Sequence, residues 1–162
     1  MTIDYSTFLH AQVIKSPNGN LVLNFELTSK GTPSYRLSYK QKPVIKASTL
    51  GIEAKDVASF IDGFTITKTE QASVNDTWNP IMGEQKTIRN NYNELLITLI
   101  QKAHKDRFIL IRFKLFNDGL GFRYEFPKQE NLKYFTIKEE HTQFNLAGDH
   151  KIFWIPGDYD TK

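Results

Sequence analysis

The fold of this chain is decided by residues 111–126, which read IRFKLFNDGLGFRYEF. Apolar and charged residues alternate up to residue 115 and again from residue 122, and a period of two is typical of half-buried strands. Between the two runs stand Asn117, Asp118 and Gly119, residue types that tolerate positive φ and therefore predict a tight hairpin. Gly121 indicates a bulge or a close backbone approach near the start of the hairpin.

The same alternation is found before this hairpin, at residues 21–27 and 34–40. Turn-forming clusters separate the runs, at residues 16–20, 31–33 and 41–43. Shorter strands are predicted at residues 43–46, 63–69, 92–101, 134–138, 143–146 and 151–155. We expect an exposed loop at residues 71–80 and at most one helical turn at residues 50–60. The sequence therefore predicts an all-β fold, an antiparallel β-sandwich of about eight to ten strands.

Length and composition exclude several classes of protein. The 162 residues are typical of one domain and too few for a (β/α)8 barrel, which needs about 250. A net charge of +3, spread along the chain, does not favour nucleic acid as a partner, and no apolar run is long enough for a membrane span. The absence of cysteine excludes disulfides, zinc–thiolate sites and thiol catalysis. No signal peptide is visible at residues 1–12.

Aromatic residues are frequent, at 13% of the chain, which suits strands and ring-stacking surfaces. Periodicity assigns many of the rings to the sandwich core: Phe113, Phe116, Phe122, Tyr124 and Phe126. Trp154 and Tyr159 remain as rings that face a site.

The titratable residues show no recognised catalytic motif. The histidines lack the spacing of a zinc-ligand pair, and His104 is interpreted as part of a solvated hairpin tip. His141 and His150 flank a predicted strand, so they could approach each other in space as a metal site or a base. Glu139 and Glu140 are adjacent, and neighbouring strand residues point to opposite faces. They are therefore poor candidates for the two opposed carboxyl groups of a glycosidase.

Two polar stretches interrupt the alternation. Residues 78–94 combine aromatic, amide, acidic and arginine side chains, which suits either a loop that binds a polar ligand or a structural polar network. The favoured interpretation is a network in which Arg89 pairs with Glu84 or Glu94 and holds a long loop. Its expected members are Glu84, Arg89, Asn90, Tyr92 and Glu94.

The second stretch, residues 153–162, brings carboxylates and rings together at the end of the sequence. Carboxylate oxygens bind hard cations, and sugars stack on aromatic faces. The candidates next to a substrate or a calcium ion are Trp154, Asp158, Tyr159 and Asp160.

These motifs resemble the N-terminal domain of glycoside hydrolase family 97. The similar stretches are Trp78 with Gly83-Glu84, IRN-x-YNEL at residues 88–95, residues 111–127, and FWIPGDYDT at residues 153–161. The turns at residues 16–21 and 29–33 fit as well. The resemblance covers residues 16 to 162 and is strongest to the starch-utilising α-glucosidases of the family. One departure is a short segment at residues 54–61, where those enzymes carry an insertion.

The resemblance implies a galactose-mutarotase-like β-super-sandwich that packs on a (β/α)8 barrel and is incomplete at the C-terminus of this sequence. Family members are exported bacterial enzymes that depend on calcium and hydrolyse α-linked glucosides or, in some cases, galactosides. The catalytic carboxylates belong to the barrel, so no catalytic residue is expected in this chain. A glutamate ligand of calcium is expected just beyond Lys162, so this chain alone is not expected to hold a metal tightly.

We therefore expect a lead-in at residues 1–15 and a sandwich domain at residues 16–162 that is inactive alone. Its expected partners are its own barrel and an α-linked oligosaccharide, and its expected location is the periplasm or another exported compartment. Two alternatives stay open. One is a free-standing carbohydrate-binding module. The other is a mutarotase-like epimerase, which would need His141 and His150 to converge near a glutamate.

Overall fold

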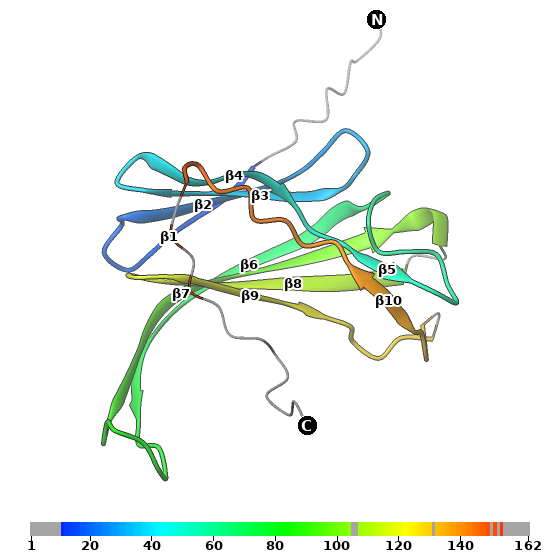
Figure 1. The fold of residues 1–162 in the computed structure, drawn as a ribbon. Coiled ribbons are helices and arrows are strands. Elements are labelled where there is room, and N and C mark those ends of the chain that lie inside the picture. The colour runs from blue at the N-terminus through cyan, green and yellow to red at the C-terminus, as the bar shows by residue number, and fades with distance from the viewer. Residues whose placement is uncertain (1–10, 105–106, 131, 150, 152, 154–162) are drawn as a thin grey trace, which may run out of the picture.

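The computed structural model describes residues 11–104, 107–130, 132–149, 151 and 153. Two four-stranded antiparallel sheets lie face to face, and a two-stranded ribbon lies at one end of them (Figure 1). The first sheet consists of β1 (Gln12–Lys15), β2 (Leu21–Leu27), β3 (Pro33–Tyr39) and β4 (Lys42–Thr49). The second consists of β6 (Thr65–Trp78), β7 (Ile88–Gln101), β8 (Arg107–Phe116) and β9 (Leu120–Glu125). The ribbon pairs β5 (Ile52–Ala54) with β10 (Ile137–Glu140).

All the pairings between these strands are antiparallel, so the predicted all-β sandwich is confirmed. A single 3-10 turn, η1 (Lys102–His104), stands where the sequence predicted a hairpin tip around His104. No helix in the described part of the chain has the length and apolar character to cross a membrane.

The hydrophobic core fills the space between the two sheets. Every second residue of the central strands points inward, and the largest fully buried side chains include Leu23, Phe25, Tyr35, Leu95, Ile97, Leu99, Ile111, Phe113 and Leu115. The rings of Phe25 and Tyr35 lie 5.8 and 6.2 Å from that of Phe113, so both sheets meet at this residue. Removing these rings and branched chains from water is the main favourable contribution to folding, at roughly 25 cal/mol per Å² of apolar surface.

The predicted hairpin is present as β8 and β9, but its turn differs from the prediction. None of residues 117–119 has a positive φ; the amide of Phe116 donates to the carbonyl oxygen of Gly119 at 2.9 Å. Gly121 lies in a regular part of the ladder with no atom near its missing side chain, so the expected bulge or close approach was wrong. The left-handed two-residue turn is instead Lys40–Gln41, between β3 and β4, where φ is 47° and 67°.

The expected loop at residues 71–80 was also wrong, because residues up to 78 form the second half of β6. This strand is exposed on both faces and carries no apolar alternation, so periodicity could not reveal it. Its partner β7 holds it through an antiparallel ladder from Thr65–Ile100 to Trp78–Ile88. The resulting hairpin extends beyond the sandwich and curls away from the first sheet (Figure 1).

Smaller corrections concern the remaining segments. Phe116, expected in the core, lies on the outer face of the second sheet, where its ring lies 5.1 Å from that of Tyr92. The predicted strand at residues 134–138 is shifted to β10, and residues 143–146 contribute only the isolated bridge of Leu146 to Ile45. The helical turn allowed at residues 50–60 is replaced by β5, and most of residues 151–155 lie outside the described residues.

Candidate functional site

The four terminal candidates, Trp154, Asp158, Tyr159 and Asp160, all lie outside the described residues, and so does His150. Their proposed roles therefore stay predictions. Three other groups of polar side chains are described: the residues expected to form a network around Arg89, a set of ion pairs centred on Arg112, and a cluster around Glu53.

The network expected around Arg89 does not form as one unit. Arg89, Asn90, Tyr92 and Glu94 belong to strand β7 and not to a loop. The guanidinium of Arg89 donates to Asn75 Oδ1 across the ladder, at 3.0 and 3.2 Å, and not to Glu84 or Glu94. The expectation failed because a regular strand sends neighbouring residues to opposite faces, so these five side chains cannot converge.

Glu94 and Tyr92 instead join a network on the outer face of the second sheet. Arg112, in the middle of β8, pairs with Glu94 of β7 on one side and with Glu125 of β9 on the other, with Nε 2.6 Å from Glu125 Oε1. Arg123 also donates to Glu125, at 2.7 Å. The Lys114 ammonium donates to the Tyr92 hydroxyl at 2.9 Å. Three strands are thus connected by charged side chains.

This network is partly shielded from solvent, and that strengthens its electrostatics. The side chains of Arg112, Glu94 and Glu125 are 21, 16 and 22% exposed. Hydrogen bonds from Arg112, which outweigh the opposing effect of burial, lower the pKa of Glu125 from 4.5 to about 2. Hydrogen bonding to Glu125 raises the pKa of Arg112 above its ordinary value. A carboxylate held this firmly in its charged form cannot serve as a general acid near neutral pH.

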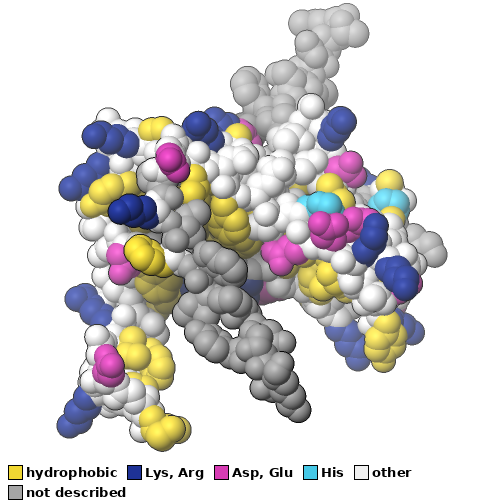
Figure 2. Space-filling model, in the orientation of Figure 1, with side chains coloured by type: hydrophobic (Ala, Val, Ile, Leu, Met, Phe, Trp, Pro, Cys, Tyr) yellow, Lys and Arg dark blue, Asp and Glu magenta, His cyan; other side chains and the backbone are white. Residues whose placement is uncertain are grey.

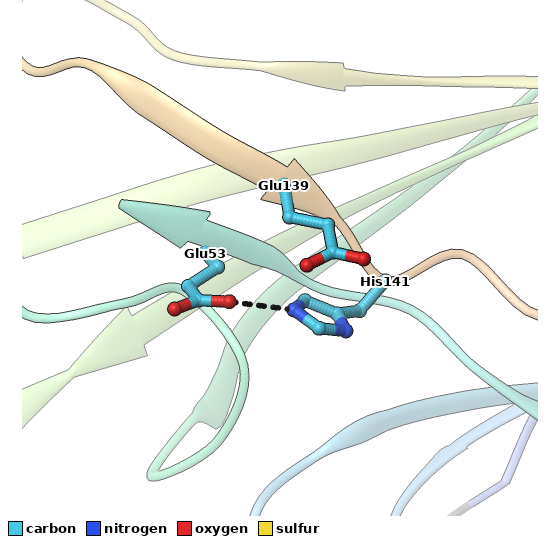
Figure 3. Close-up of side chains that lie close together, drawn as sticks. All are labelled: Glu53, Glu139 and His141. Atoms are coloured by element: carbon cyan, nitrogen blue, oxygen red, sulfur yellow. Dashed lines mark hydrogen bonds and ion pairs between the residues drawn. The ribbon is translucent and has the colours of Figure 1, made fainter. Parts of the chain in front are cut away.

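The third group lies where β5 and β10 pair, and Figure 3 shows its side chains converging. Glu53 lies opposite Glu139 in the strand register, and His141 follows directly after β10. The ligand-type atoms of these three residues all lie within 4.8 Å of one another. A hydrogen bond of 3.0 Å joins His141 Nε2 to Glu53 Oε2, while the other oxygen of Glu53 accepts from Lys138 Nζ at 2.6 Å. Figure 2 shows acidic and histidine side chains gathered on this side of the molecule.

These contacts define a set of ion pairs that connects the two strands of the ribbon. The hydrogen bond from Lys138, followed by that from His141, lowers the pKa of Glu53, whereas a glycosidase acid needs a raised one. Calcium prefers six to eight oxygen ligands, and this cluster offers two carboxylates with an imidazole and an ammonium group beside them. The cluster therefore fits neither glycoside hydrolysis nor the calcium site of the family.

Glu139 and Glu140 behave as predicted for strand neighbours. Glu139 faces Glu53, whereas Glu140 accepts a hydrogen bond from Thr142 Oγ1 at 2.5 Å. Glu140 also borders an apolar groove of about 650 Å³ between β9 and β10, together with Phe122, Tyr124, Ile137 and Phe144. Among the described residues that line it, Glu140 is the one carboxylate, so the groove lacks the opposed pair that glycosidases use.

The fold is that of β-sandwich domains found in glycoside hydrolases. A family 97 enzyme from Pseudoalteromonas sp. strain K8, solved in complex with panose and in complex with acarbose, is 38% identical to this chain and superposes with a TM-score of 0.78. The family described as glycosyl-hydrolase 97 N-terminal matches residues 14–162. The chain therefore belongs to glycoside hydrolase family 97 and corresponds to its N-terminal domain.

The match to the Pseudoalteromonas enzyme covers 84% of this chain but only 20% of the solved one, so the chain spans about a fifth of that relative. A β-arabinopyranosidase, 22% identical over 88% of this chain and 24% of its own, shares the fold with a TM-score of 0.75. The family, predicted from the motifs, is confirmed; substrate, metal and catalytic roles are matters for the whole enzyme.

Sequence reasoning missed the ion pairs of Arg112 and Glu53 as sites. A signal for the first was present, because Arg112 and Lys114 alternate with core residues and so share the outer face. The hairpin register sets Arg112 opposite Arg123, and Glu125 stands two residues further along the same face. The pairing of β5 with β10 joins segments about 85 residues apart, which no local pattern indicates.

Proposed function

We propose that this chain is the non-catalytic N-terminal β-sandwich of a calcium-dependent α-glycosidase, packing on a (β/α)8 barrel and bordering its active site. The observation that carries the proposal is the family match over residues 14–162, together with a relative solved with panose and acarbose. Panose and acarbose are both oligosaccharides with α-linked units. The substrate class we assign to the parent enzyme is therefore an α-linked oligosaccharide.

The described geometry supports a supporting role for this part of the enzyme. The carboxylates of Glu94 and Glu125 are paired with arginine, and Glu53 is paired with Lys138 and His141. Hydrolysis needs one carboxylic acid that donates a proton and a second that acts as base or nucleophile across the same bond. In the proposed enzyme those two groups come from the barrel, and the sandwich contributes a wall of the site. Its location is the periplasm or another exported compartment.

The experiment compares two proteins with p-nitrophenyl α-glucoside as substrate: the 162-residue chain and the full-length parent. The parent is expected to release p-nitrophenol, and the chain alone to give the rate of buffer. An α-galactoside is assayed in parallel to separate the two substrate classes. Turnover by the chain alone would contradict the division of labour, and a parent inactive on both glycosides would contradict the α-glycosidase assignment.

Among the alternatives, the epimerase lacks support from the described residues. It needs two histidines near a glutamate, and although His141 bonds to Glu53, His150 lies outside the described residues. Replacing His141 by alanine in the parent is expected to leave glycoside turnover within twofold of the original. A free-standing sugar-binding module is tested by calorimetry of the chain with maltooligosaccharides, where we expect no heat of binding.

A further inference from the structure

The outer face of the second sheet differs in composition from that of the first sheet. In the first sheet, outward residues such as Asn24, Glu26 and Arg36 are polar, as expected for a face in water. In the second sheet, the outward positions of β7 and β8 include large apolar side chains. They are Leu96, Ile100, Phe108, Leu110 and Phe116, all partly exposed. A sheet that is apolar on both faces is characteristic of an internal layer.

The strand register gathers these side chains into one surface. Ile100 stands opposite Phe108 and Thr98 opposite Leu110, which forms an apolar zone at one end of the sheet. The ion pairs of Arg112 occupy the next rows, and Tyr92 with Phe116 lies beyond them. Since the carboxylates here are already paired with cations, covering the face would leave little unpaired charge. We call these residues of β7, β8 and β9 the outer face.

The β6–β7 hairpin extends past the outer face on the side away from the first sheet (Figure 1). Its tip carries hydrophobic side chains, visible at the end of the projection in Figure 2. Trp78 is 49% exposed, and Ile81 and Met82 are almost entirely exposed. Cross-strand bonds such as Arg89 to Asn75 support the hairpin. Apolar side chains held in water at the end of a strand pair mark a contact surface.

We propose that the outer face and the hairpin tip together form the surface through which this domain packs on the catalytic barrel of its own parent enzyme. The proposal rests on the function proposed above and adds the residues of the interface. The solved relative is about five times as long as the region matched here, so the parent supplies a large body to be packed. Interfaces between domains of one chain bury roughly 600–1,500 Å² and mix apolar with polar groups, as this surface does.

The test places a photocrosslinker in the full-length parent. Phe108→p-benzoylphenylalanine puts the probe in the apolar zone, and Arg36→p-benzoylphenylalanine puts the same probe on the outer face of the first sheet. After irradiation and digestion, mass spectrometry is expected to find Phe108-site crosslinks to barrel peptides at least tenfold more abundant than those from the Arg36 site. Equal yields, or Phe108-site crosslinks only to a second copy of the protein, would overturn the proposal.

A second variant tests the hairpin tip. In the Phe108-probe background, Ile81→Ser with Met82→Ser is expected to lower the crosslink yield to the barrel severalfold. An unchanged yield would remove the tip from the interface. The glycosidase assay of the same parent separates the two proposals: an active parent without barrel crosslinks overturns only the interface, whereas an inactive parent with barrel crosslinks overturns only the activity.

Discussion

Arg107 is a cation buried without a carboxylate partner among the described residues. It is 4% exposed, lies 4.1 Å from the centre of the Phe60 ring, and donates from Nε to Gln101 Oε1 at 2.8 Å. Its Nη2 donates to the carbonyl oxygens of Ala58 and Ser59. Burial lowers its pKa below the ordinary value. The residue therefore anchors the segment before β6 to the start of β8 by hydrogen bonds to neutral acceptors.

Replacing Arg107 by methionine is expected to destabilise the chain by about 2–4 kcal/mol, because buried carbonyl oxygens and Gln101 lose their donor. Urea unfolding followed by tryptophan fluorescence measures the change. The matched control is Arg36→Met, which breaks the exposed pair with Glu26 and is expected to cost less than about 1 kcal/mol. Equal losses in the two variants would show that Arg107 has no special role.

Glu125 makes the stability of the second sheet depend on pH. Its pKa falls from 4.5 to about 2 on folding, so the stabilisation is complete above the unfolded pKa and is lost as pH falls from about 5 to 2. We expect a loss of about 1–3 kcal/mol over that window. Glu125→Gln is expected to flatten this part of the profile in urea titrations between pH 7 and 2. A variant with the original slope would contradict the assignment.

At the scale of elements, strands with one buried face were predictable and strands in water were not. The alternation in β2, β3, β8 and β9 has its cause in the core, so it appears in the sequence. The outer half of β6 is held only by its ladder with β7, and ladder hydrogen bonds leave no trace in residue type. The turn at Lys40–Gln41 has the same origin, since the registers of β3 and β4 impose it on residues that do not favour positive φ.

Gly31 lies in the turn before β3, with a φ of +75°. A side chain here would come within 2.7 Å of the backbone nitrogen and oxygen of Phe64, at the start of the chain that leads into β6. Gly31→Ala is expected to cost about 2–4 kcal/mol, the sum of backbone strain and this clash. Gly19→Ala, with φ +74° and open space, is the control and is expected to cost only about 1 kcal/mol. Thermal unfolding compares the two; similar shifts would rule out the clash.

At the scale of the whole molecule, calcium is expected to matter for the enzyme and not for this domain. The described carboxylates are engaged with arginine, lysine and histidine and do not form an oxygen cage. Chelation with EGTA is expected to lower the turnover of the parent at least tenfold, with recovery on adding calcium. The melting temperature of the 162-residue chain is expected to stay unchanged in EGTA. A shift in that temperature would place a calcium site in the chain itself.

The candidate site shows the limit of the sequence at this largest scale. Motifs around residues 88–95 and 111–127 were sufficient to predict the family, which the comparisons confirm. They did not show which side chains converge, because Glu53 with Lys138 and Glu94 with Arg112 meet only through the pairing of distant strands. Period and spacing predict the face a residue occupies, while its partner depends on sheet order and register.

The order of the strands also bears on how the domain is synthesised. The inner faces of β2 and β3 are covered by β7 and β8, which leave the ribosome much later. At roughly 5–20 residues per second, the side chains of Leu23, Phe25 and Tyr35 wait several seconds before Leu95 and Phe113 are available. During that interval the nascent first sheet exposes its apolar face. A chaperone that binds extended apolar segments is therefore expected to contact residues 21–39 on stalled ribosomes and to leave once β8 has emerged.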